Sequence, residues 1–253
     1  MSEKRYYDSF DQDFAESKGQ DYKLPDDYRW VHDSFWYRLL AALFYPLVVV
    51  FAWCCMRIGF GLRIKNRKVF CKVKGGYFLY SNHVQLLGDV VDPFLITFPK
   101  HPYIICSAAN LGIPVIGKRI LPLAGALPLP EDLNGMKRFT SAVKTRIRQK
   151  KCVVVYPEGH LWPYYTEIRP FLPAAFHYPV ANQAPVVVAT TVFVRRRWHK
   201  KPRPIVYLDG PFSVDKDLPK KQQMRQLEND VRVAMERRMP LNTQKYITYV
   251  AKS

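Results

Sequence analysis

An uncharged run from Leu39 to Met56 constrains this chain more than any other feature of its sequence. The run reads LLAALFYPLVVVFAWCCM. A membrane-spanning helix needs about 20 apolar residues, so the run stands at the lower limit of length. Pro46 lies in its middle and is expected to kink a helix. Three interpretations follow: a kinked re-entrant or interfacial helix, a true membrane span, or a buried helix of a soluble domain.

Aromatic and basic residues flank this run. The aromatic ones precede it, as at a membrane interface: Trp30, Phe35, Trp36 and Tyr37. Arg38 also precedes it, and the basic residues that follow are Arg57, Arg63, Lys65, Arg67 and Lys68. Basic flanks favour the cytoplasmic side of a membrane. We therefore expect residues 34–64 to form a membrane-associating helical segment and the protein to lie on the cytoplasmic face.

The net charge is unevenly distributed along the chain. The 253 residues carry a formal charge of +18. Residues 1–33 are acidic with a charge of −4, which leaves +22 for residues 34–253. We expect residues 1–33 to form a solvated, partly disordered arm. The basic remainder predicts an anionic partner, either nucleic acid or an anionic membrane surface. With 48% hydrophobic residues the chain is not intrinsically disordered.

Strand-like and helix-like patterns alternate after the arm and the apolar segment. Strands are predicted at 68–73, 77–82, 103–106, 152–156, 185–194 and 204–210. Gly75-Gly76 favours a hairpin between the first two. Helices are predicted at 93–98, from an N-cap at Asn134 to about 151, and at 218–239. We expect one α/β domain over residues 65–253, with a mixed sheet flanked by helices.

A histidine and an aspartate follow the strand predicted at 77–82. Asn82 and His83 stand at its end, and Asp89 comes six positions after His83. Sites in α/β sheets are built at strand ends. A carboxylate beside an imidazole fixes its tautomer and raises its basicity, which suits a general base that removes a proton from a hydroxyl. Asp92 is the alternative partner, and a histidine that merely caps a loop is the alternative role.

A second polar turn follows the strand predicted at 152–156. Pro157, Glu158, Gly159 and His160 come next in the chain. Gly159 permits a tight turn with exposed N–H groups, which could bind an oxyanion or a phosphate. The alternative is an ordinary β-turn with a solvated glutamate.

Taken together and in this order, the two blocks resemble the glycerolipid acyltransferases, the lysophosphatidate acyltransferase-like enzymes. That family has an Asn-His…Asp block at a strand end, then a Phe-Pro-Glu-Gly block and a Val-Pro-type strand. The matching positions here are Asn82-His83…Asp89, Tyr156-Pro157-Glu158-Gly159 and 184–188. The resemblance covers roughly residues 65–210, and the family also has an N-terminal membrane-associating element.

The resemblance implies transfer of an acyl chain from acyl-CoA or acyl carrier protein to the hydroxyl of a lysophospholipid such as 1-acylglycerol-3-phosphate. His83 would be the general base and Asp89 would orient it, with no metal and no cofactor beyond the thioester co-substrate. Asn82, Glu158 and Gly159 would help to bind the substrates. The chain departs from the family by one extra residue between histidine and aspartate.

A second departure concerns the acceptor phosphate. Between the two blocks, residues 125–130 stand where the family has a Gly-containing acceptor-binding block. Family members that use phosphate-bearing acceptors usually carry one arginine in that block and another after Pro-Glu-Gly. Here Pro130-Glu131 and His160-Leu161 occupy those neighbourhoods. Lys118, Arg119 or Arg169 would have to replace those arginines, with Lys137 and Arg138 as further candidates. An amino- or glycolipid acceptor is therefore the first alternative function.

The residues 195–203 form a dense basic loop around Trp198. It fits an anionic membrane surface, a nucleic acid or a solvated hairpin tip. No nucleic-acid motif accompanies it, so we expect no nucleic-acid partner. A non-catalytic basic peripheral membrane or nucleic-acid-binding protein is the alternative from a different class. The sequence assigns no oligomeric state.

Overall fold

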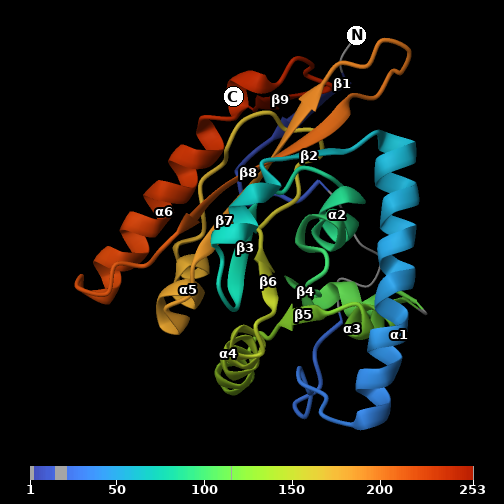
Figure 1. The fold of residues 1–253 in the computed structure, drawn as a ribbon. Coiled ribbons are helices and arrows are strands. Elements are labelled where there is room, and N and C mark those ends of the chain that lie inside the picture. The colour runs from blue at the N-terminus through green and yellow to red at the C-terminus, as the bar shows by residue number, and fades with distance from the viewer. Residues whose placement is uncertain (1–2, 15–21, 115, 253) are drawn as a thin grey trace.

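The computed structural model describes residues 3–14, 22–114 and 116–252, and Figure 1 shows a central mixed sheet between helices. The strand order is β2-β8-β7-β3-β6-β4-β5. Five of these strands run parallel to one another: β7 (Val186–Val194), β3 (Tyr77–Ser81), β6 (Cys152–Val155), β4 (Pro102–Ser107) and β5 (Ala126–Leu129). Two run the opposite way: β8 (Arg203–Phe212) and β2 (Arg63–Lys65). The carboxyl ends of the five parallel strands therefore meet at one edge, called here the carboxyl edge.

Helices cover both faces of the sheet (Figure 1). One face carries α1 (Phe35–Ala52), α2 (Gly88–Thr97) and α3 (Ile116–Leu123). The other carries α4 (Leu133–Arg148), α5 (His177–Asn182) and α6 (Lys220–Glu236). Successive side chains of a strand point to opposite faces, so Phe78 packs in the core under α4 and α6, and Leu79 packs in the core under α1 and α2. The predicted α/β domain with a mixed sheet is confirmed.

Short 3₁₀ helices connect these elements: η2 (Arg67–Lys72), η3 (Ala108–Gly112), η4 (Pro173–Phe176) and η5 (Met239–Leu241). Residues 68–73 were predicted to be a strand in a hairpin with 77–82. This prediction is wrong, because most of them belong to the 3₁₀ helix η2. The physical reason lies in β3, whose two edges are already occupied by β6 and β7. The predicted N-cap of α4 is also wrong by two residues. Asp132, rather than Asn134, caps the helix by accepting a hydrogen bond from Gly135 N–H at 2.7 Å.

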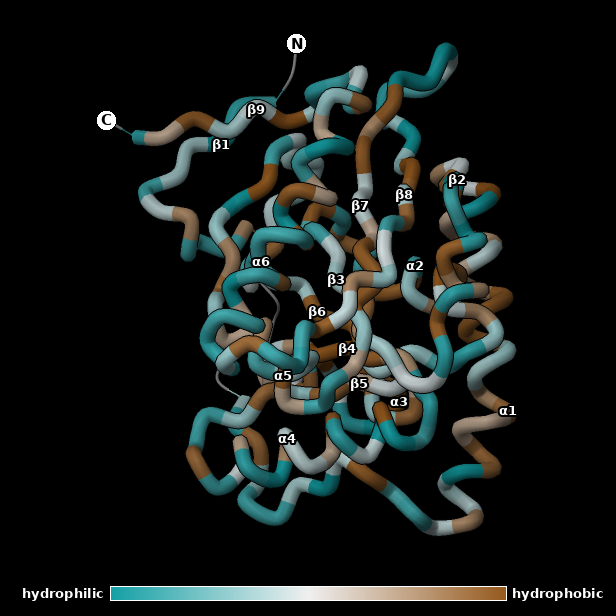
Figure 2. Tube along the Cα trace, turned by 60° about the vertical axis from the view of Figure 1, so that its left-hand side comes forward, coloured by the Kyte–Doolittle hydropathy of each residue, from teal (hydrophilic) through white to brown (hydrophobic). Residues whose placement is uncertain are grey.

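The apolar run forms α1 and continues as a π-helix, η1 (Trp53–Phe60). Together they make one helix of 26 residues, whose most apolar 18-residue window has a mean hydropathy of 2.3. By length and composition this helix could cross a membrane. The helix passes through Pro46 and leaves α-helical geometry only at Trp53. Figure 2 shows α1 along one side of the molecule, and only 11% of its most apolar window is buried. The interpretation as a buried helix of a soluble domain is therefore wrong.

The acidic N-terminal segment packs on the domain wherever the structure describes it. β1 (Glu3–Tyr7) pairs in parallel with β9 (Ile247–Ala251). Gln12 O accepts a hydrogen bond from Trp162 Nε1 at 2.7 Å, and Trp30 is buried in the core. Aromatic side chains among the acidic ones thus provide apolar anchors for these parts, and the partial disorder of the segment stays a prediction. Residues 1–2 and 15–21 lie outside the described part.

Candidate active site

Asn82 fixes the end of β3 at the carboxyl edge. Its side chain is fully buried and exchanges two hydrogen bonds with the backbone of Thr191 on the neighbouring β7. Thr191 N–H donates to Asn82 Oδ1 at 2.8 Å, and Asn82 Nδ2 donates to Thr191 O at 3.0 Å. Asn82 was predicted to help bind a substrate. In the structure its amide is occupied by β7, so it positions the residue that follows, His83.

His83 and Asp89 form a direct pair. His83 Nδ1 lies 2.7 Å from Asp89 Oδ2. The same carboxylate oxygen accepts a hydrogen bond from Gln85 N–H at 2.8 Å. The imidazole therefore carries its proton on Nδ1, facing the carboxylate, which leaves Nε2 as the basic nitrogen. The His83 side chain is 21% exposed, whereas the Asp89 side chain is 4% exposed, so solvent and a substrate can reach the imidazole.

The extra residue between His83 and Asp89 lies in a helical turn at the start of α2. Asp89 N–H donates to Gln85 O at 3.0 Å, which closes one helical turn ahead of α2. Gly88 makes room for that turn, since a Cβ there would lie 2.6 Å from the Gln85 carboxamide. Asp89 thus stands in the first turn of α2, where the helix dipole favours a carboxylate.

Asp92 is not the partner of His83. Its Oδ2 instead accepts a hydrogen bond from Gln85 Nε2 at 2.8 Å. Burial raises the pKa of Asp92 well above its usual value, and the nearby Asp89 raises it further. Burial also raises the pKa of Asp89, but hydrogen bonds from His83 and from Gln85 N–H oppose that rise. Burial therefore favours the neutral acid at Asp92, whereas the hydrogen bonds to Asp89 favour its charged form.

Tyr156 belongs to this site although sequence reasoning assigned it no role. Its ring stacks on the His83 imidazole with 4.3 Å between the ring centroids. Its hydroxyl donates a short hydrogen bond to the backbone carbonyl of Asp89. Burial raises the Tyr156 pKa well above its usual value, so the hydroxyl remains a donor. The signal was present in the sequence, because a tyrosine stands where the family block has phenylalanine.

Glu158 accepts a hydrogen bond from the backbone of His83. Its side chain is 0% exposed, so the interpretation of a solvated glutamate in an ordinary turn is wrong. Glu158 Oε2 accepts hydrogen bonds from His83 N–H at 3.1 Å and from Arg169 Nη2 at 2.8 Å, and Oε1 accepts from Arg169 N–H. Arg169 is 1% exposed and also donates to His160 O. Glu158 and Arg169 were predicted to bind a substrate. Because the two side chains are buried and paired with each other, they position the loop of His83 instead.

The Gly159 turn does not present free N–H groups. Gly159 has a φ of +78°, the left-handed conformation that favours glycine. Its N–H donates to Tyr156 O at 3.1 Å, and His160 N–H donates to Glu158 O at 3.0 Å. The donors expected to bind an oxyanion are therefore used within the turn itself in this conformation.

Two of the remaining predicted cations, Lys118 and Arg119, lie on α3. Lys118 and Arg119 are exposed in the first half of α3, and Lys118 Nζ lies 4.7 Å from the centroid of the Tyr22 ring. Within the described part of the chain no contact joins either of them to His83. The same part holds no group of three or more His, Cys, Asp and Glu side chains that could bind a metal ion.

The basic loop 195–203 joins β7 to β8 at the carboxyl edge. Arg196 Nη1 donates to the carbonyls of Gly59 and Phe60 at the end of η1. Trp198 is 83% exposed at its tip. The loop and the end of the apolar helix are therefore joined on the side of the molecule that carries His83.

No protein-family profile matches this chain, and no curated protein matches it. Among solved structures, the 1-acyl-sn-glycerophosphate (LPA) acyltransferase PlsC from Thermotoga maritima matches with a TM-score of 0.57 at 12% sequence identity. The match covers 78% of this chain and 80% of that one. This chain has the fold of that acyltransferase. The fold expected from the sequence resemblance is thereby confirmed over most of both chains.

Proposed function

We propose that this protein is an acyltransferase that moves an acyl chain from a thioester, acyl-CoA or acyl carrier protein, to the hydroxyl of a lysophospholipid. The observation that carries the proposal is the pair of His83 and Asp89 at the carboxyl edge, 2.7 Å apart, with the imidazole partly exposed. The shared fold with an acyltransferase that acts on 1-acyl-sn-glycerophosphate supports that acceptor class.

The proposed reaction proceeds by general base catalysis. His83 Nε2 removes the proton of the acceptor hydroxyl while its oxygen attacks the thioester carbonyl carbon. The tetrahedral intermediate collapses with cleavage of the carbon–sulfur bond, and the imidazolium returns the proton to the leaving thiolate. Asp89 keeps the imidazole in the required tautomer and stabilises its charged form. The products are an ester and a free thiol, and no acyl-enzyme forms.

The acceptor phosphate needs a cation that a substrate can reach. Arg169 is excluded from that role because it is 1% exposed and paired with Glu158. Lys118 and Arg119 are exposed, and α3 starts on the carboxyl side of β4. We assign the phosphate to these two residues.

The chain is proposed to act at an anionic membrane surface on the cytoplasmic face. The outward side of the α1–η1 helix exposes large apolar residues: Phe35, Trp36, Leu39, Leu40, Leu43, Leu47, Val50, Phe51, Trp53 and Ile58. The inward side is packed on the domain through Ala52 and Met56. A helix with one apolar face open and the other docked on its own domain fits an interfacial position better than a span.

The test is an assay of the purified protein with palmitoyl-CoA and a panel of lysophospholipid, amino-lipid and glycolipid acceptors, with products identified by mass. We expect acylated lysophosphatidate from the wild type. In His83→Ala the rate should fall by about 10²–10⁴-fold, the usual contribution of a general base, with an unchanged circular dichroism spectrum.

Three results would contradict the proposal. Equal turnover in His83→Ala would remove the histidine from the mechanism. Free fatty acid in place of acylated lipid would make the protein a hydrolase. Product with an amino- or glycolipid acceptor alone would shift the acceptor class away from lysophospholipids.

A further inference from the structure

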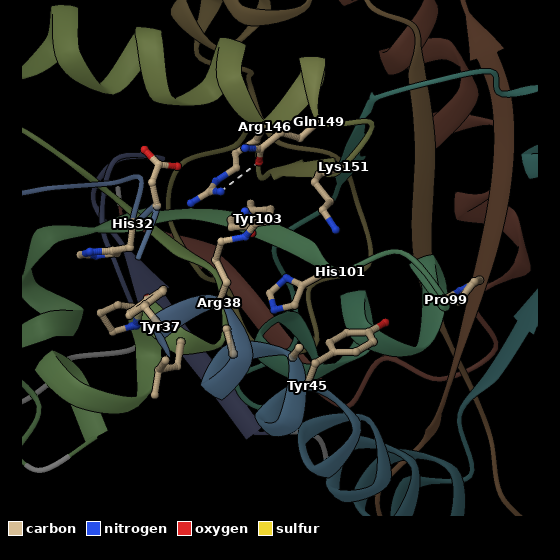
Figure 3. A pocket seen from close by; sticks show the side chains of 15 residues that line it. His32, Tyr37, Arg38, Tyr45, Pro99, His101, Tyr103, Arg146, Gln149 and Lys151 are labelled. Carbon is tan, nitrogen blue, oxygen red and sulfur yellow. Dashed lines mark hydrogen bonds between the residues drawn. The ribbon is translucent and has the colours of Figure 1, made fainter. Parts of the chain in front are cut away.

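A cavity of about 630 Å³ lies at the edge of the sheet opposite His83. Figure 3 shows its lining. His101 comes just before β4, and Gln149 and Lys151 come just before β6, so the cavity opens at the amino ends of the parallel strands. His83 follows the carboxyl end of β3. The cavity is therefore separate from the proposed catalytic site, and nothing in the proposed reaction uses it.

Three cations from three different segments line the cavity. Arg38 comes from α1, Arg146 from the last turn of α4, and Lys151 from the start of the β6 segment. In Figure 3 their side chains extend into the same space. Within the described part of the chain none of the three forms an ion pair, and Asp33 is the one carboxylate among the lining residues. The lining thus has an excess of two positive charges, counting the histidines as neutral.

Arg146 is the most constrained of these cations. It is 8% exposed, and its guanidinium lies 4.2 Å from the centroid of the Tyr103 ring. Nη1 donates to Gln149 Oε1 and Nη2 donates to Trp30 O, both at 3.0 Å. Nε is buried and has no partner in the described residues. A buried charged donor without an acceptor is costly, and an anion in the cavity would relieve that cost.

The two histidines of the cavity respond to this positive charge. Burial, followed by the repulsion of Lys151 and Arg146, lowers the pKa of His101 to about 4, although its hydrogen bond to Pro102 O opposes the change. Burial together with Arg146 and Arg29 also lowers the pKa of His32, against a smaller effect of Asp33. Both imidazoles are therefore neutral at pH 7, and the cavity without a ligand repels further positive charge.

The side of α1 that faces the domain borders the cavity. Arg38, Ala41 and Tyr45 line it from that side. Leu40, Leu43 and Leu47 are exposed on the opposite side of the helix. The cavity is therefore separate from the exposed apolar side of α1.

We propose that this cavity binds a phosphate group, carried either by a lipid headgroup or by a soluble phosphate compound. The site lies apart from the substrate at His83. It goes beyond the proposed reaction and requires no turnover.

The test compares two double variants of the full chain. Arg38→Ala with Lys151→Ala removes two cations from the cavity. Lys144→Ala with Arg148→Ala removes two exposed cations from α4 that do not line it. Each variant is measured for sedimentation with phosphatidylcholine vesicles containing phosphatidic acid, and for binding of inorganic phosphate by calorimetry. Since each cation near an anionic phosphate contributes about 1 kcal/mol, we expect the cavity variant to bind vesicles, inorganic phosphate or both roughly 10- to 30-fold more weakly.

The control variant should lose less than about threefold, because its cations meet only the diffuse surface charge. Weaker binding of both probes, or of vesicles alone, in the cavity variant supports a lipid headgroup site. Weaker binding of inorganic phosphate alone supports the site and identifies its ligand as a soluble phosphate compound. Equal behaviour of the two variants overturns the site altogether.

The conservative pair Arg38→Gln with Lys151→Gln, checked for an unchanged thermal midpoint, replaces the alanine pair if that one does not fold. His83→Ala should bind both probes like the wild type. That result separates a failure of this site from a failure of the proposed acyl transfer.

Discussion

Two aspartates three residues apart acquire different roles because of a single glutamine. Gln85 donates its backbone N–H to Asp89 and its side-chain Nε2 to Asp92. Asp89 is left facing His83, whereas Asp92 is enclosed without contact to the imidazole. The carboxylate that serves the histidine is thus chosen by the local hydrogen bonds rather than by distance along the chain.

Replacement of each aspartate by asparagine should separate these roles. Asp89→Asn places an amide beside Nδ1, which disturbs the tautomer that leaves Nε2 basic. We expect acyl transfer to fall by about 10²-fold or more in that variant. Asp92→Asn should retain activity within about threefold, because an amide resembles the neutral acid already present there. The measurement is the initial rate of acyl transfer from palmitoyl-CoA in each variant. A larger loss in Asp92→Asn than in Asp89→Asn would make Asp92 the partner of His83.

Asp92 also predicts a dependence of stability on pH. Its pKa in the folded protein is well above the unfolded value of 3.8. Above pH 3.8 the unfolded chain releases a proton that the folded protein retains, so this group favours unfolding increasingly until the pH reaches its folded pKa. Asp92→Asn should therefore gain stability relative to the wild type as the pH rises, by at most about 1.4 kcal/mol per pH unit. Urea unfolding at pH 5, 6 and 7 measures the difference, and a constant difference would contradict the prediction.

At the scale of elements, α1 with η1 is a helix with two different sides. Ala52 and Met56 pack on the same core as β3 and α2. Leu43 and Leu47 are 62% and 65% exposed on the opposite side. Exposure of such a row of leucines to water is unfavourable in free energy, whereas the interface of a membrane would bury their side chains.

Charged residues on the outward side of α1 should weaken membrane binding without disturbing the fold. We expect Leu43→Glu with Leu47→Glu to bind phosphatidylcholine–phosphatidic acid vesicles at least about tenfold more weakly, since each leucine loses its apolar burial. Leu133→Glu with Val233→Glu is the matched control, because both residues are exposed on helices of the other face. Equal vesicle binding by the two variants would argue against an interfacial α1.

At the scale of the whole molecule, the buried pair of Glu158 and Arg169 joins segments that are far apart in the chain. Glu158 follows β6, yet it accepts hydrogen bonds from His83 after β3 and from Arg169 in the long connection to η4. Trp162 packs against the same arginine and, through its ring, against Tyr7 and Phe10 of the N-terminal segment. One ion pair thus lies where the loop of His83, the turn after β6 and the N-terminal segment meet.

Removal of the charge of Glu158 should therefore destabilise the protein. Glu158→Gln leaves the Arg169 guanidinium buried without a counter-charge, which typically costs about 3–5 kcal/mol. The control is Glu167→Gln, whose ion pair with Lys245 is more than half exposed and should be worth about 1 kcal/mol or less. Urea unfolding gives both values. A similar small cost for the two variants would show that the buried pair does not hold the molecule together.

Local sequence pattern was enough to predict several parts of this protein. Apolar residues predicted the strands that became β4, β6, β7 and β8. In β6 the apolar run is continuous, because a strand buried on both faces is apolar at every position. The Asn82-His83…Asp89 block predicted the paired imidazole and carboxylate. The uncharged run predicted a long apolar helix.

Features that depend on neighbours distant in the chain emerged only from the folded structure. Residues 68–73 carry a strand-like pattern, but β3 has no free edge to pair with them. The sequence predicts Asn82 and Glu158 as substrate ligands. In the fold, the side chain of Asn82 is hydrogen-bonded to Thr191, and that of Glu158 to His83 and Arg169. The sequence predicts a solvated acidic N-terminal arm. In the fold, Trp162 donates a hydrogen bond to Gln12 O and Trp30 is buried in the core. Each case has the same physical reason: a side chain's role depends on which hydrogen-bond partners and apolar surfaces remain open to it after the chain has folded.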